Sequence, residues 1–273
     1  MRKLDIKEVQ QVSLEILKIV ADICEQEGLR YFLVYGTLIG AIRHKGYIPW
    51  DDDVDIMMPR PDYEKLLEYM KEHRDEYGCI RVFNPYTCKD YPYMITRISD
   101  ERYVIDMKNE KSYGMGIFID IYPYDGLGQT EEEALKFGMK GDRLSSWCYQ
   151  ATRKHYAVET TTSLIKKVLK FPVFCIAKIC GKNMFQKKLA KLAGIKSYDE
   201  NKYVGCVVWL SGGMKDIFIK EWFDEYIMVP YEKYEFRVPK RYDEILTHIY
   251  GDYMQLPPEK DRIGHHYYDV YEK

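Results

Sequence analysis

Apolar residues recur at helical spacing near the start of the chain and in short continuous runs after it. Between residues 6 and 27 this spacing predicts an amphipathic helix that ends at Gly28. β-Branched and aromatic runs at 30–36, 53–58 and 116–123 predict buried strands, and weaker strand patterns lie near 80–84, 93–98 and 102–107. A helix with Pro61 in its first turn follows the second strand. The pattern is that of a mixed α/β (α+β) chain.

The pattern changes after Gly126, where helical spacing replaces the strand runs. Thr130 and Glu133 have the spacing of a helix-capping pair. We therefore expect a boundary near residue 128, with a core over 1–128 and a mainly helical region over 129–273. Within that region, Pro172 is expected to divide the segment 163–196 into two helical pieces. A last helix is expected to end at Gly251.

Composition places the chain among ordinary globular proteins. Its 273 residues are 46% hydrophobic and 31% charged, and the net charge of −2 argues against a nucleic-acid binder. No apolar run approaches the roughly 18 residues that a membrane span needs, and the N-terminus does not have the pattern of a secretory signal. The seven cysteines are scattered singly without a CxxC pair. A reducing compartment, the cytoplasm, is therefore expected.

The segment 163–196 carries a local charge that the total conceals. It contains nine lysines and no acidic residue, interleaved with Leu, Ile, Val and Phe. An apolar helix side bordered by lysines suits the surface of an anionic membrane. The alternative is a pair of ordinary helices packed on the core, with a solvated basic face.

The stretch PWDDDVDIMMP (49–59) holds the strongest candidate chemistry. If it is extended, Asp51, Asp53 and Asp55 share one face of a strand, where their charges repel one another. A proton or a cation would relieve that repulsion, and hard carboxylate oxygens suit Mg²⁺ or Mn²⁺. A solvated acidic loop is the alternative. A calcium EF-hand is disfavoured because Ile56 and Asp62 stand where that motif needs glycine and glutamate.

Residues before and after this stretch extend the candidate site. Gly36 and Thr37 end the preceding strand and could hold a phosphate at the start of the next helix. The connection that follows carries three further candidates for neutralising phosphate charge, unless they are simply solvated: Arg43, His44 and Lys45.

Asp120 lies in the middle of the apolar strand pattern GIFIDIYP. A buried acid is costly unless it is paired or binds a metal. With the first cluster it would make a site of carboxylates on two strands, able to hold two metal ions for phosphoryl transfer. The alternative is a buried partner for an arginine.

Three stretches, 35–66, 118–125 and 250–266, resemble the LicD family of phosphocholine transferases, which are related to fukutin-type ribitol-phosphate transferases. The resemblance implies a nucleotidyltransferase-like fold, a small mixed sheet flanked by helices. It also implies Asp53 and Asp55 as a metal pair, Asp120 as the third carboxylate, and Asp51 as a direct or water-mediated ligand.

The resemblance further implies transfer of phosphocholine from CDP-choline to a sugar hydroxyl of a cell-surface glycan or teichoic acid precursor, with release of CMP. A lipid-linked acceptor would suit work at the inner face of the cell membrane. Aromatic rings bind quaternary ammonium groups, so we expect a choline cage among four C-terminal tyrosines, unless they serve packing: Tyr250, Tyr253, Tyr267 and Tyr268. Three more residues would belong either to a closing segment that binds the donor or to a packing segment: Arg262, His265 and His266.

Three other functions stay open on the sequence. A nucleotidyltransferase acting on a small hydroxyl compound would release pyrophosphate instead of CMP. A transferase of the same family could use another CDP-linked donor, such as CDP-ribitol. A non-catalytic module that binds a metal or a glycan could keep the same fold.

Overall fold

A seven-stranded mixed sheet forms the centre of the computed structural model, which describes residues 1–156, 164–209, 212–262 and 268–273. The strand order is β2-β3-β7-β5-β4; β3 and β7 are parallel, the other pairs are antiparallel, and β8 and β9 extend the sheet from β7. The predicted mixed sheet is confirmed. The strands are β2 (Phe32–Leu33), β3 (Asp55–Pro59), β4 (Ile80–Phe83), β5 (Thr96–Asp100), β7 (Ile117–Gly128), β8 (Tyr203–Gly205) and β9 (Phe218–Ile219).

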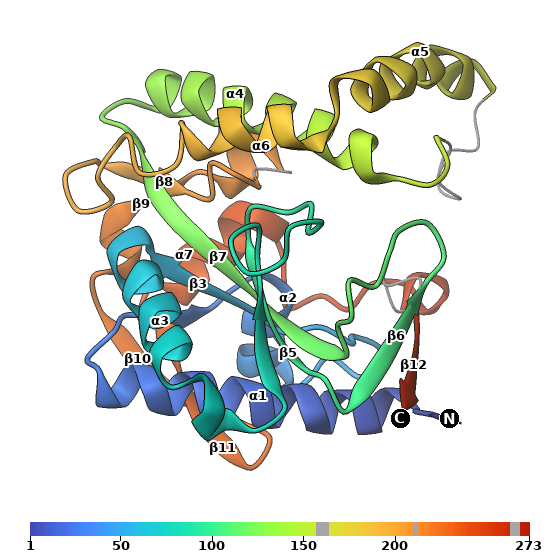
Figure 1. The fold of residues 1–273 in the computed structure, drawn as a ribbon. Coiled ribbons are helices and arrows are strands. Elements are labelled where there is room, and N and C mark those ends of the chain that lie inside the picture. Colours follow the sequence, from blue (N-terminus) through green and yellow to red (C-terminus); the bar gives the residue numbers. More distant parts are fainter. Residues whose placement is uncertain (157–163, 210–211, 263–267) are drawn as a thin grey trace.

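Helix α1 (Ile6–Gln26) runs across one face of this sheet and contacts β5 and β7 (Figure 1). Asp5 and Glu8 cap its first turn reciprocally, and Leu17 and Val20 on its apolar side are fully buried. Helix α3 (Arg60–Glu72) follows β3 directly and packs on β3 and β7. Helix α2 (Tyr35–Ile39) continues into a single π-helical turn (Gly40–His44).

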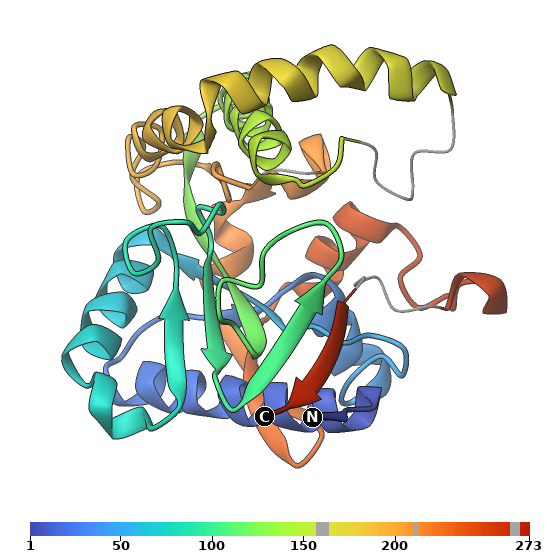
Figure 2. The ribbon, with the colours of Figure 1, turned by 45° about the vertical axis from the view of Figure 1, so that its right-hand side comes forward.

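Helices α4 (Glu131–Thr152), α5 (Leu164–Cys180) and α6 (Lys182–Ala190) form a separate layer. Both views place this layer on the side of the molecule opposite α1 (Figures 1 and 2). A buried ion pair lies beside its junction with the sheet: Asp125 of β7 accepts two hydrogen bonds from Arg60 and one from the backbone of Gly194. Within the described residues, no helix has the length and apolar character needed to cross a membrane.

Two smaller sheets complete the fold. Strands β1 (Arg2–Lys3), β12 (Tyr268–Glu272) and β6 (Tyr103–Met107) pair antiparallel, which brings the two termini side by side (Figures 1 and 2). Strands β10 (Tyr226–Tyr231) and β11 (Tyr234–Pro239) form a hairpin, and β11 contacts β2. Helix α7 (Tyr242–Tyr250) packs against α2 and ends at Gly251 as predicted. The C-terminal third of the chain therefore returns to the N-terminal core.

Three predicted elements are corrected. Only Phe32–Leu33 of the run 30–36 is a strand, because the chain turns into α2 at Tyr35, whose φ is 51°. The strand expected over 53–58 begins at Asp55. Pro172 does not divide its segment: α5 is continuous, and the break comes at Gly181, whose φ of 72° a helix cannot accept. Pro172 is exposed, so water can satisfy the carbonyl that its missing N–H leaves unbonded.

Candidate active site

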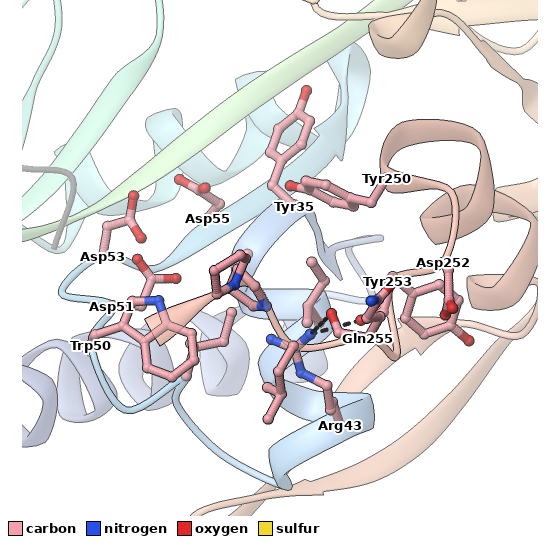
Figure 3. Close-up of a pocket in the computed structure, with 16 residues that line it drawn as sticks. Tyr35, Arg43, Trp50, Asp51, Asp53, Asp55, Tyr250, Asp252, Tyr253 and Gln255 are labelled. Carbon is pink, nitrogen blue, oxygen red and sulfur yellow. Dashed lines mark hydrogen bonds between the residues drawn. The ribbon is translucent and has the colours of Figure 1, made fainter. Parts of the chain in front are cut away.

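A cavity of about 710 Å³ lies where α2, the loop before β3 and the segment after α7 meet. Figure 3 shows Asp51, Asp53 and Asp55 together on one side, with the residues that follow α7 on the other. The structure thus brings the first and last sequence motifs together. Among the residues that line the cavity are Tyr35, Gly36, Arg43, Trp50, Asp51, Asp53, Asp55, Tyr250, Asp252 and Tyr253.

The backbone of Asp55 is held on both sides at the start of β3. Its N–H donates to Thr37 Oγ1 at 2.9 Å, and its carbonyl accepts from the Val34 N–H at 3.1 Å. Thr37 is buried, so its hydroxyl positions Asp55, whereas the sequence predicted a direct contact with donor phosphate. The strand register also sets Asp55 beside Asp120 of β7, with both side chains on the same face of the sheet.

One oxygen of the Asp55 carboxyl group has no hydrogen-bond partner within the described structure. Its Oδ1 is buried and makes no hydrogen bond there. Burial raises the pKa of Asp55 well above the ordinary value, and the nearby charges of Asp53, Asp120 and Asp51 raise it further, against a smaller opposing effect of Arg97. A buried acceptor oxygen among like charges is suited to bind a cation.

This donor set agrees with a hard divalent cation, since it consists of carboxylate oxygens. The described residues nevertheless contain no group of three His, Cys, Asp or Glu side chains already arranged to hold a metal ion. The agreement with a divalent cation therefore rests on the unsatisfied oxygen of Asp55 and on the carboxylates of Asp51 and Asp53, which line the same cavity.

Asp51 and Asp53 reach the cavity from a loop instead of from the predicted strand face. Gln10 of α1 steadies this loop by donating from Nε2 to the Asp51 carbonyl at 2.7 Å. The bare Cα of Gly36 leaves room for the Asp51 side chain, because a Cβ at Gly36 would lie 2.7 Å from Asp51 Oδ2. Gly36 therefore has a specific role beside the acidic cluster.

The Gly36→Ala variant is expected to fold normally and to lose activity by about tenfold or more, because the added methyl displaces a carboxylate that can rotate away. Gly40→Ala is the matched comparison. There a Cβ would lie 2.4 Å from the backbone carbonyl of Gly46, so we expect a lower melting temperature. Melting curves and turnover of both variants test this; wild-type turnover in Gly36→Ala would contradict the role given to Asp51.

Asp120 has a partner that the sequence left open as an alternative. Arg97, its register partner on β5, donates from Nε to Asp120 Oδ1 at 2.8 Å. The two side chains are 12% and 6% exposed, and the Arg97 guanidinium lies 4.1 Å from the centre of the Phe118 ring. The pair compensates one buried carboxylate beside Asp55. Sequence reasoning missed Arg97 because only the pairing of β5 with β7 brings it to Asp120.

The candidates for phosphate binding separate into different environments. Arg43 lines the cavity, but its Nη1 already donates to the Tyr253 carbonyl at 2.7 Å, which fastens the C-terminal segment. Partial burial and the neighbouring Arg43 lower the pKa of His44, so its imidazole is uncharged at neutral pH. Lys45 has an exposed side chain and a left-handed backbone, with φ at 58°, and does not line this cavity.

The C-terminal candidates are brought near the cavity to different extents. Tyr250 and Tyr253 line it, and the Arg262 guanidinium lies 5.7 Å from the centre of the Trp50 ring. The centre of the Tyr268 ring lies 5.9 Å from that of the Phe118 ring, and burial, followed by the charges of Asp52 and Asp53, raises the pKa of Tyr268. Three predicted residues lie outside the described part of the chain: His265, His266 and Tyr267.

Several lining residues were not selected from the sequence, among them Tyr35, Trp50 and Asp252. Tyr35 and Trp50 both precede the acidic run, and the available signal was their aromatic character, which suits binding of a quaternary ammonium group. Asp252 adds a carboxylate from the segment after α7. Nothing in its local sequence distinguishes Asp252 from a solvated turn residue.

Comparisons with known proteins identify the family of this chain. Residues 28–155 match the family model described as LicD/FKTN/FKRP, nucleotidyltransferase domain. The chain is 34% identical over 278 residues to the lipopolysaccharide cholinephosphotransferase LicD of Haemophilus influenzae, covering 99% of each protein. It is 48% identical over 42 residues to the mouse ribitol 5-phosphate transferase FKRP, which covers 15% of this chain and 8% of that protein. By its full-length similarity, the chain belongs to the LicD family.

Proposed function

We propose that this protein transfers phosphocholine from CDP-choline to a sugar hydroxyl of a cell-surface glycan and releases CMP. The observation that carries the proposal is the similarity, over 99% of both chains, to the Haemophilus influenzae lipopolysaccharide cholinephosphotransferase. The family makes the chain a phosphotransferase. The donor, the acceptor and the requirement for a metal are the proposed parts.

Asp51, Asp53 and Asp55 are proposed to hold Mg²⁺ or Mn²⁺, with two ions expected. The unbonded Oδ1 of Asp55 and the mutual repulsion of the cluster support this, because a cation would satisfy both. The metal would supply charge stabilisation for the donor diphosphate and for the leaving phosphate. Titration calorimetry with Mn²⁺ alone measures the number of ions and whether Asp55→Asn removes binding.

Asp120 is proposed to accept the proton of the acceptor hydroxyl. The acceptor oxygen forms a bond to the phosphorus of phosphocholine, the bond from that phosphorus to the bridging oxygen breaks, and CMP leaves with that oxygen. Arg97 engages Oδ1 of Asp120, so Oδ2 is the oxygen assigned to the proton. Arg97 acts as a positioning residue that fixes the orientation of this carboxylate.

Choline is proposed to bind against the aromatic side of the cavity. Tyr250 and Tyr253 offer aromatic rings for a quaternary ammonium, and Asp252 adds a negative charge on the same side of the cavity, whereas Trp50 lies across from them beside Asp51. Arg262 is proposed to contact the donor phosphate, because its guanidinium lies 5.7 Å from the centre of the Trp50 ring, which lines the cavity.

A related donor is the nearest competing proposal. The short match to FKRP, a ribitol 5-phosphate transferase, falls within the same family and favours testing CDP-ribitol. It covers 15% of this chain, whereas the cholinephosphotransferase match covers 99%. Phosphocholine is therefore the preferred group.

The deciding experiment incubates the protein with Mg²⁺ and, separately, CDP-choline, CDP-ribitol or CTP, with and without lipopolysaccharide as a trial acceptor. CMP and pyrophosphate are measured together. Acceptor-dependent CMP release from CDP-choline is the expected result. Pyrophosphate from CTP would overturn the proposal in favour of a nucleotidyltransferase, and CMP from CDP-ribitol alone would change the donor. Binding of CDP-choline without turnover under any condition would favour a non-catalytic module.

A further inference from the structure

Helix α5 presents an apolar face outward, away from the rest of the protein. Ile179 and Val168 are 86% and 71% exposed, and Phe171 and Ile176 are about half exposed. These four residues fall on one broad side of the helix, since positions 168 and 179 are about three turns apart. The stripe runs for about 16 Å along the helix at 1.5 Å per residue. Leaving so many large aliphatic side chains in water is unfavourable, so the face has the character of a binding surface.

The other side of α5 attaches it to the protein. Ala177 is fully buried, Phe174 is half-buried, and the helix contacts α4 and α6. The polarity of α5 is therefore reversed relative to an ordinary surface helix, whose apolar side faces the core. Its apolar exposure is a property of the docked helix and does not come from the helix being detached.

Basic residues lie on α5 itself and elsewhere in the same helical layer. Lys170 and Lys178 of α5 have exposed side chains. Between α4 and α6 lies a groove whose lining residues are all basic or apolar, and its basic members are Lys136, Lys140, Arg143, Lys188 and Lys191. With the absence of acidic residues between 163 and 196, α5, α6 and the groove beside α4 join apolar exposure to concentrated positive charge, and the acidic residues of α4 lie in its first turn and at Asp142. That combination attracts a surface that is both apolar and anionic.

We propose that the α4–α6 layer docks on an anionic lipid membrane, with the α5 stripe inserted among the lipid chains and the lysines at the headgroups. Charge decides in favour of lipid over a second copy of the chain, because pairing two α5 faces would bring two lysine-rich segments together without acidic partners. Within the described residues no helix can span a membrane, so contact would be made in the plane of the surface. The proposal does not depend on which donor the enzyme uses.

The test is flotation of the purified full chain with vesicles, without donor or acceptor. One set of vesicles is phosphatidylcholine alone, and the other mixes phosphatidylcholine and phosphatidylglycerol in equal parts. We expect flotation with the anionic vesicles only, weakened by salt through screening. The Val168→Ser/Ile179→Ser variant is expected to reduce binding by about tenfold or more, because it removes two inserted side chains. The Lys140→Gln/Lys188→Gln/Lys191→Gln variant is expected to reduce it by roughly fivefold per lysine.

The matched control is Tyr226→Ser/Met228→Ser, which removes two half-exposed apolar side chains from the β10–β11 hairpin, outside the α4–α6 layer. It should float as the wild type does. Melting temperature and CMP release are measured for every variant, and neither should change in the α5 variant, since both of its residues are exposed and outside the cavity. Absence of flotation with anionic vesicles would overturn the proposal. So would light scattering that reports a dimer which the α5 variant converts to a monomer.

Discussion

The Asp55→Asn variant is expected to lower turnover by on the order of a thousandfold or more and, at the same time, to raise the melting temperature of the metal-free protein. Turnover falls because Asp55 is the proposed ligand with an unsatisfied oxygen, and removal of comparable electrostatic stabilisers has that scale of effect. Stability rises because asparagine keeps the shape and the backbone bonds to Thr37 and Val34 without the buried charge.

The raised pKa of Asp55 determines how the stability of the metal-free protein changes with pH. Asp55 has a folded pKa above its ordinary value of about 4. The folded state therefore binds the proton more tightly than the unfolded state, and the metal-free wild type loses stability as pH rises from about 4 through the raised pKa. Asp55→Asn lacks this loss, so the difference in melting temperature should grow with pH and then level off. Each kcal/mol corresponds to roughly 2–4 °C for a chain of this size.

Asp52→Asn is the matched control, because Asp52 belongs to the same acidic run but does not line the cavity. We expect its turnover to stay within about tenfold of the wild type, because its carboxylate lies outside the cavity and is not a proposed metal ligand. Melting curves across pH and CMP release with Mg²⁺ measure both effects. Normal turnover in Asp55→Asn, or a lower melting temperature at neutral pH, would remove Asp55 from the centre of the mechanism.

The Arg97→Met variant is expected to destabilise the fold by about 3–5 kcal/mol. Methionine fills similar space but leaves the buried carboxylate of Asp120 without its cation, next to the carboxylate of Asp55. The variant also loses the stacking of the Arg97 guanidinium on the Phe118 ring. If a divalent cation binds here, adding Mn²⁺ should recover part of the lost stability, because binding to the folded state alone raises it.

Urea unfolding with and without Mn²⁺ measures this prediction. The control is Arg81→Met on the neighbouring strand β4, where the partner Glu101 is 39% exposed at 3.4 Å, so the loss should stay below about 1 kcal/mol. Equal losses in the two variants would mean that the Arg97–Asp120 pair contributes little beyond a surface ion pair. Asp120→Asn combined with Arg97→Met should be less destabilised than Arg97→Met alone, since the unpaired charge is then absent.

Local pattern was sufficient for much of the fold. The spacing of apolar residues in α1, the capping pair at Thr130 and the glycine after α7 are short-range properties, and the structure has each where the sequence predicted it. The same reasoning failed at 30–36, where a residue with positive φ starts α2 two residues after the strand, and at Pro172, whose effect depended on its exposure. Both outcomes depend on surroundings that periodicity does not contain.

The candidate site was likewise predicted only in part from the sequence. The acidic run 51–55 and the buried position of Asp120 were visible in the sequence, because charged residues among apolar ones are unfavourable without a partner. The sequence offered two partners for Asp120, a metal or an arginine, and the structure pairs it with Arg97. Strand pairing made that contact, and no spacing along the chain encodes which of the arginines it will be.

Residue order alone therefore establishes the types of elements, the acidic chemistry and the family, since each of these lies in short contiguous patterns. Tertiary structure decides that Thr37 supports Asp55, that residues 250–258 face the acidic loop, and that the apolar side of α5 points outward. These facts depend on contacts between segments far apart in the chain, where burial and pairing set the energy of each group.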